Sequence, residues 1–81
     1  MAKLRILSSA GDNIVEWDEA GVRQGDPDAL AAVREAERIF EEHRARGATA
    51  FVVAPDQPAR RIDQFDPEAE HVVVVPRVAG G

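Results

Sequence analysis

The 81-residue chain contains no cysteine and no tyrosine, and it has only one tryptophan and three phenylalanines. Without cysteine it can form no disulfide, no thiolate metal site and no thiol nucleophile. It has no run of about 18 apolar residues that could cross a bilayer as a helix, and residues 1–6 lack the apolar stretch of a signal peptide. We therefore expect a cytoplasmic protein that is stabilised by core packing alone.

Positive charge is also scarce, because 10 Lys and Arg stand against 15 Asp and Glu, for a formal net charge of −5. This balance argues against non-specific nucleic-acid binding and offers no polybasic segment for a membrane surface. A chain this short makes one small domain without a large catalytic cleft between lobes. Its 44% of hydrophobic residues are enough for a globular core.

The first quarter of the chain has the pattern of a β-hairpin. Residues 3–7 alternate polar and apolar side chains, and residues 14–17 form a second short strand. The intervening residues 8–13 are rich in turn formers, which explains Ser8, Ser9 and Asp12 without any nucleophilic role. Residues 18–25, which include two glycines, are expected to be a loop.

A long amphipathic helix follows this loop. Asp26 supplies an N-cap carboxylate, Pro27 occupies the first helical position, and Gly47 is expected to end the helix after about five turns. One face of the helix is apolar, with Ala29, Val33, Ala36 and Phe40 at steps of three and four.

The rest of the chain predicts three strands and a single helical turn. The strands cover residues 48–54, 60–63 and 71–75, the second of them weak, and the helical turn covers residues 65–70. Pro55 and Pro76 close the first and last of these strands. The order ββαβ(β)β describes a single α+β domain.

The last strand is all valine and predicts an uncovered sheet face. Successive side chains of a strand point to opposite faces of the sheet, so Val72 and Val74 lie on one face and Val73 and Val75 on the other. One long helix covers only one face, so we expect an open apolar strip on the other, with Arg5, Val73 and Val75 as candidate partner contacts. The alternative is that loops or Trp17 cover this strip.

Neither histidine indicates a metal site. His71 begins a strand with no Cys and no second His at ligand spacing, and His43 lies on the apolar side of the helix near its C-terminal end. Packing and the helix dipole account for His43. The acids Asp56, Asp63 and Asp66 lie in loops without the helical phasing of an acid–base pair.

The chain closes with Pro76-Arg77-Val78-Ala79-Gly80-Gly81. We expect residues 1–76 to form the domain and residues 77–81 to extend from it as a flexible arm. Glycines lack Cβ, so Gly80 and Gly81 allow the backbone to pass through the narrow channel of an enzyme that activates a terminal carboxylate. The alternative is a disordered end or a cloning remnant.

The element order and the di-glycine ending together resemble the ubiquitin-like β-grasp family over essentially the whole chain. The ending Pro-x-Val-Ala-Gly-Gly is also similar to the small sulfur-carrier subunit of molybdopterin synthase. Those carriers commonly have a second proline where Arg77 stands, and the Asp-Gly-Asp-Glu-Val turn often found before their last strand is absent here. The long helix and the extended region 48–65 look more like ubiquitin-like proteins of bacterial conjugation operons, which include antiphage systems.

This resemblance implies a mixed sheet of four or five strands packed on one long helix. It also implies that an E1-like activating enzyme uses ATP and Mg²⁺ to adenylate the carboxylate of Gly81, beside Gly80, while Arg77, Val78 and Ala79 contact partner enzymes. An E2-like conjugating enzyme would carry the thioester to target proteins, and a JAMM-type or other deconjugating peptidase would remove the modifier. The chain would then be a substrate with no catalytic residue and no bound cofactor.

Two alternatives remain open from the sequence. The first is a sulfur carrier that bears a C-terminal thiocarboxylate. The second is a non-covalent β-grasp adaptor that binds through its open sheet face. Because Lys3 is the single lysine, attachment of one copy is easier to support than chain building through internal lysines.

Overall fold

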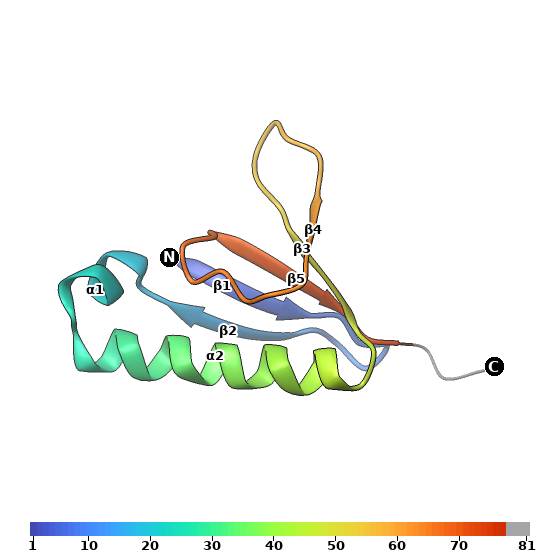
Figure 1. Cartoon of the computed structure of the whole chain (residues 1–81), viewed down its shortest axis with the longest axis horizontal. Helices are drawn as coiled ribbons and strands as arrows, with labels where there is room; N and C mark the ends of the chain where they lie inside the picture. The colour runs from blue at the N-terminus through green and yellow to red at the C-terminus, as the bar shows by residue number, and fades with distance from the viewer. Residues whose placement is uncertain (78–81) are drawn as a thin grey trace.

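A five-stranded mixed sheet and one long helix make up most of the molecule, which the computed structural model describes for residues 1–77 (Figure 1). The elements in chain order are β1 (Ala2–Ile6), β2 (Asn13–Trp17), α1 (Glu19–Gln24), α2 (Pro27–Ala45), β3 (Thr49–Val52), β4 (Arg60–Ile62) and β5 (His71–Val75). All five expected strands are present, which confirms the α+β class and the mixed sheet on a long helix.

The strand order in the sheet is β2-β1-β5-β3-β4. The first and last strands, β1 and β5, are parallel neighbours in the middle, with Lys3 opposite His71 and Ile6 opposite Val74. The hairpin β1–β2 and the antiparallel pairs β5–β3 and β3–β4 complete the sheet. The chain therefore leaves β5 from the centre of the sheet, and not from an edge.

The core lies between the sheet and α2. Alternate residues of the two central strands are fully or almost fully buried against the helix, which contributes Ala36 and Phe40. Phe65 links the aromatic side chains, because its ring lies 5.5 Å from that of Trp17 and 5.6 Å from that of Phe40. The strand residues of this core are Ala2, Leu4, Ile6, Val72 and Val74.

The long helix begins and ends at the predicted positions. The Asp26 carboxylate accepts a hydrogen bond from the Ala29 amide at 3.1 Å, and Pro27 is the first helical residue. At the other end Gly47 adopts the left-handed conformation with φ of +93°, which favours glycine. The Gly47 amide donates to the Arg44 carbonyl at 2.9 Å, and this bond satisfies one of the last carbonyls of the helix.

Two sequence-based expectations are wrong. Residues 18–25 are not a loop, because they contain α1, which Asp18 caps and Gly25 ends with φ of +77°. Residues 65–70 do not form a helical turn. Instead, the Asp66 side chain accepts a hydrogen bond from the Glu68 amide at 3.0 Å, and the backbone carbonyl of Asp66 accepts one from the Ala69 amide at 3.2 Å. These two hydrogen bonds make a single reverse turn.

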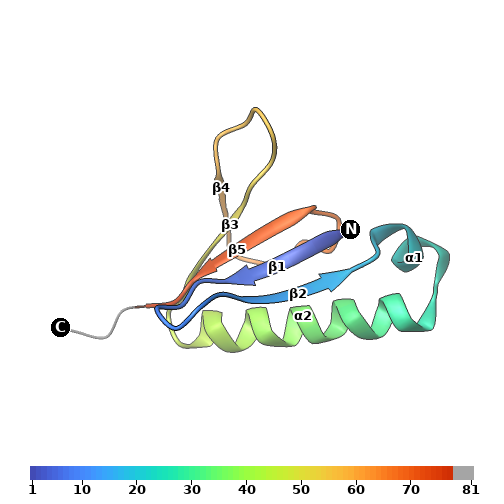
Figure 2. The same ribbon diagram turned by 180° about the vertical axis from the view of Figure 1, so that it is seen from behind.

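The connection between β3 and β4 projects away from the rest of the sheet, as Figures 1 and 2 show from opposite sides. The end of β5 lies at the same end of the molecule as the last turn of α2 (Figure 2). None of the helices found in residues 1–77 is long and apolar enough to cross a membrane.

Candidate functional site

The sheet face opposite α2 is one of two candidate surfaces, and we call it the open face. Strand partners share a face, so the register places one row of side chains across all five strands. This row comprises Ile14, Arg5, Val73, Phe51 and Arg61, in strand order. Neighbouring rows of the open face add Lys3, Glu16, His71, Thr49 and Val75.

The open face contains all three residues that the sequence assigned to it. Arg5 and Val73 are half-buried and Val75 is 37% exposed, whereas Val72 and Val74 are fully buried on the helix side. Trp17 does not cover this face, because it pairs with Ala2 and is buried in the core beneath α2.

Sequence reasoning missed the contributions of Ile14, Phe51 and Arg61 to the open face. Ile14 is 47% exposed at the edge of the sheet, and Phe51 lies directly beside Val73. The alternation within each strand was visible, but the strand order and register that bring these side chains into one row depend on contacts between distant segments.

The charge of the open face is opposite to that of the whole protein. The outward charged groups of its strands are three cations, Lys3, Arg5 and Arg61, and one carboxylate, Glu16, which give a formal charge of +2. Arg5 Nε also lies 4.0 Å from Asp12 Oδ2 of the β1–β2 connection, which partly balances its charge. Because the chain carries −5, the remaining residues carry −7. An acidic partner surface would therefore be attracted to this face and repelled elsewhere.

His71 adds an unused hydrogen-bonding group to the open face. Its side chain is half-buried, and its Nε2 atom is buried with no hydrogen-bond partner in residues 1–77. Burial lowers the pKa of His71 below the ordinary value of 6.5, and the positive charges of Lys3 and Arg5 lower it further. The neutral imidazole is therefore the predominant form at pH 7.

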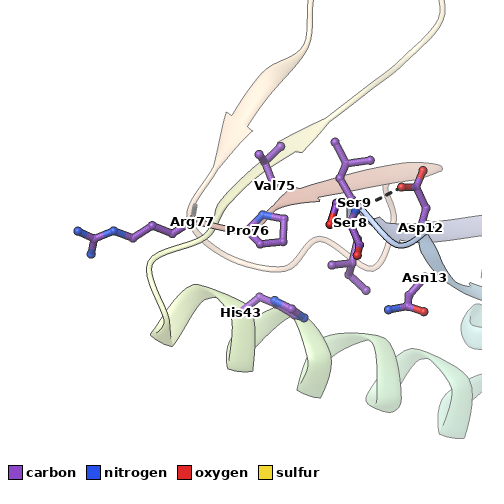
Figure 3. Close-up of a pocket in the computed structure, with 10 residues that line it drawn as sticks. Ser8, Ser9, Asp12, Asn13, His43, Val75, Pro76 and Arg77 are labelled. Atoms are coloured by element: carbon purple, nitrogen blue, oxygen red, sulfur yellow. Dashed lines mark hydrogen bonds between the residues drawn. The ribbon is translucent and has the colours of Figure 1, made fainter. Parts of the chain in front are cut away.

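The second candidate surface is a cavity of about 690 Å³ at the end of the molecule where the chain leaves β5 (Figure 3). We call it the tail-root cavity. Its walls come from the β1–β2 connection, including Ser8 and Ser9, from His43 of α2, and from Pro76 after β5. Figure 3 shows Pro76 and His43 facing each other across this space.

Arg77 stands at the edge of the tail-root cavity. It is exposed, yet the stem of its side chain lies against Gly47, where an added Cβ would come within 3.1 Å of Arg77 Cδ. The left-handed glycine that ends α2 thus leaves room for Arg77. The Arg77 side chain extends outward from the cavity edge (Figure 3).

The remaining residues of the predicted tail site, Val78, Ala79, Gly80 and Gly81, lie outside the described residues 1–77. Within residues 1–77, no group of three or more His, Cys, Asp or Glu side chains could hold a metal ion. The two histidines belong to different surfaces, because His43 lines the tail-root cavity and His71 lies on the open face.

Comparisons with known proteins found no matching family model, no matching curated protein and no matching solved structure.

Proposed function

We propose that this protein is a bacterial ubiquitin-like modifier of the β-grasp fold, which is conjugated to target proteins through the carboxylate of Gly81. The observation that carries the proposal is the exit of a di-glycine segment from the central strand. β5 ends at Val75, and the two glycines Gly80 and Gly81 stand five and six residues after it. A central strand held by neighbours on both sides gives such a segment a fixed starting point for presentation to an enzyme.

The chemistry needs nothing from this chain except its terminal carboxylate. A carboxylate is a poor electrophile, so an activating enzyme first lets the Gly81 oxygen attack the α-phosphorus of ATP, which forms the acyl-adenylate and releases pyrophosphate. An enzyme cysteine thiolate then attacks the acyl carbon and releases AMP. Finally a lysine amine of the target attacks the thioester, loses a proton and releases the thiol, which leaves an isopeptide bond.

The proposal is tested by the mark that this chain would leave on its targets. Arg77 is the last site at which trypsin cleaves, so a digested conjugate keeps Val-Ala-Gly-Gly on the modified lysine. The full chain, tagged at its N-terminus, is expressed in the organism that encodes it and purified under denaturing conditions. Wild type should yield lysines with this remnant, and a chain without Gly80 and Gly81 should yield no conjugates. Conjugates that persist after the deletion would contradict the proposal.

A sulfur carrier is the nearest chemical alternative, because the ending of such carriers, like Val78-Ala79-Gly80-Gly81 here, has a short apolar stretch before two glycines. In that reaction sulfide, in place of an enzyme cysteine, attacks the acyl carbon of the adenylate and releases AMP, which leaves a thiocarboxylate. If an enzyme persulfide attacks instead, the product is an acyl disulfide, and a second enzyme thiol then reduces it to the thiocarboxylate and forms a disulfide with the first enzyme sulfur. The intact mass of the same purified protein separates the two reactions, since a thiocarboxylate replaces one oxygen by sulfur. We place both activities in the cytoplasm, where ATP is available.

The cationic and partly apolar open face favours a second candidate function, that of a non-covalent adaptor for an acidic partner that presents apolar side chains. Val73 and Phe51 form the apolar centre of this face, with Arg5 and Arg61 on either side. For an adaptor, Val73→Glu should remove the partner that copurifies with the native protein, and deletion of Gly80 and Gly81 should not. Ala59→Glu in the exposed β3–β4 connection is the matched control.

A further inference from the structure

The two edges of the sheet are formed by β2 and β4, which stand at opposite ends of the strand order (Figures 1 and 2). Within residues 1–77 no strand pairs with the outer side of either one, and no backbone hydrogen bond outside the strand pairs involves β2 or β4. An edge strand presents a row of backbone N–H and C=O groups that can pair with another strand. Both edges are therefore available to a strand from another molecule.

The pairings within the sheet fix the relative direction of the two edge strands. β2 runs antiparallel to β1, and β1 runs parallel to β5. Because β5 and β4 are both antiparallel to β3, β4 runs in the direction of β1 and opposite to β2. If a second copy lies beyond β4 in the same orientation, its β2 is therefore antiparallel to β4. The two sheets then continue as one at the usual strand spacing of about 4.8 Å, with both open faces on the same side.

The side chains of the two edges match in one antiparallel register. Arg61 and Glu16 both lie on the open face, whereas Ile62 and Val15 both lie on the helix side and pack with the core. When Arg61 of one copy stands opposite Glu16 of the next, Ile62 stands opposite Val15. This register thus combines an opposite-charge pair with an apolar pair, and both kinds of cross-strand pair stabilise a sheet.

The charged members of this register are available for pairing. Arg61 and Glu16 are both exposed, and the ion pairs found among residues 1–77 involve other side chains. Two β4 strands paired about Arg61 would instead place two arginines opposite each other, which destabilises a sheet. Such edge charges commonly prevent contact between like edges. Because β2 carries the opposite charge at Glu16, Arg61 disfavours a second β4 and favours β2.

We infer that the β4 edge of one copy docks the β2 edge of the next, so that the partner of each edge is a second copy of this chain. The contact is heterologous, because it joins two different surfaces, and copies that keep one orientation assemble head to tail without closing. Their open faces form one continuous surface along the assembly. This inference goes beyond the modifier function and does not depend on it, since the edge residues lie outside the C-terminal segment.

Charge reversal at the junction tests this inference with the purified full chain. Arg61→Glu places a carboxylate opposite Glu16, and Glu16→Arg places a cation opposite Arg61. Arg23→Glu on α1 and Glu37→Arg on α2 are the matched controls, because both positions are exposed and the net charge changes by the same amounts. Circular dichroism confirms the fold of each variant.

Association is followed by sedimentation velocity over about a hundredfold range of protein concentration. Each copy carries a net charge of −5, which opposes association at long range. The buffer therefore contains salt at about 0.15 M, where the screening length is about 8 Å.

The sedimentation coefficient of wild type should rise with concentration beyond that of a dimer, and both controls should behave like wild type. Arg61→Glu and Glu16→Arg should each raise the concentration needed for assembly at least about tenfold. An equimolar mixture of these two variants should assemble again, because every mixed junction pairs a carboxylate with a cation.

Three results would overturn the inference. The first is a wild type that stays monomeric or stops at a dimer, the second is edge variants that assemble like their controls, and the third is a mixture that does not assemble. The modifier function is tested separately by the Val-Ala-Gly-Gly remnant and stands or falls without these results, because every variant keeps the C-terminal segment.

Discussion

Gly21 allows α1 to pack directly on α2. A Cβ added at this position would lie 2.9 Å from the Ala29 Cβ and 3.3 Å from an Asp18 carboxylate oxygen. Gly21→Ala should therefore lower the free energy of unfolding by about 1–3 kcal/mol, the usual cost of overpacking a tight contact. Urea denaturation measures this change, with Ala20→Ser, an exposed position in the same helix, as the control. Gly21→Ala as stable as wild type would show that the helices do not pack this closely.

His71 makes stability depend on pH in a defined direction. Because its pKa is lowered in the folded state, the unfolded chain binds a proton on this side chain more readily in the interval below 6.5. The contribution of neutral His71 to the free energy of unfolding is therefore complete above pH 6.5. It is lost as the pH falls from 6.5 through the lower pKa of the folded state. Between about pH 7.5 and 5.5, on either side of the ordinary histidine pKa, the free energy of unfolding should fall more for wild type than for His71→Gln. Equal slopes for the two proteins would contradict this assignment.

At the scale of whole elements, the start of α2 depends on one side chain. Asp26 Oδ2 accepts from the Ala29 amide, one of the amides that have no partner within the helix. Asp26→Ala should cost about 1 kcal/mol of stability, and Asp26→Asn, which keeps an acceptor oxygen, should cost much less. Circular dichroism during urea denaturation follows both the helix content and the transition. Equal losses for the two variants would mean that the hydrogen bond is not what stabilises this end of the helix.

The elements that could be predicted from the sequence are those with local signals. Asp26, Pro27 and Gly47 mark both ends of α2 within a few residues of the turns they control, and the structure agrees with all three. The short helix α1 carries similar signals, but its six residues with Gly21 inside would be marginal in isolation. It is stabilised by packing on α2, and a sequence does not reveal such contacts.

The same limit explains the wrong prediction for the turn before β5 and the residues that were missed on the open face. Asp66-Pro67 has the chemistry of a helix start, yet the same residues also suit a reverse turn. The indole N–H of the distant Trp17 donates to the Pro67 carbonyl at 3.2 Å, and this hydrogen bond holds the reverse turn against the core. The alternation of side chains along β5 correctly predicted that Val73 and Val75 lie on the same face. It did not reveal that Phe51 lies beside Val73, since that neighbour depends on strand order.

At the scale of the whole molecule, both candidate surfaces follow from the parallel pairing of β1 with β5. This pairing brings the first strand beside the last, so Arg5 and Val73 meet on the open face. At the far end of the same two strands, the residues after β1 and after β5 enclose the tail-root cavity. A change in strand order would therefore remove both surfaces together.

A disulfide introduced between these strands tests the pairing directly, because the chain has no cysteine of its own. Arg5 and Val73 are partners in the parallel register, and neighbouring strands lie about 4.8 Å apart, within the range that a disulfide bridges. Arg5→Cys with Val73→Cys should oxidise to an intramolecular disulfide that raises the free energy of unfolding by about 2–4 kcal/mol, and reduction should remove this gain.

The matched control is Ile14→Cys with Val73→Cys. These positions lie in the same row of the open face, but β1 separates their strands by two strand spacings, about 9.6 Å, which is too far for a disulfide. The control pair should keep two free thiols under the same oxidation, as measured by intact mass after alkylation. If instead Ile14→Cys with Val73→Cys closes and Arg5→Cys with Val73→Cys does not, β1 is not between β2 and β5. Both the open face and the tail-root cavity would then lose their structural basis, because each depends on β1 lying beside β5.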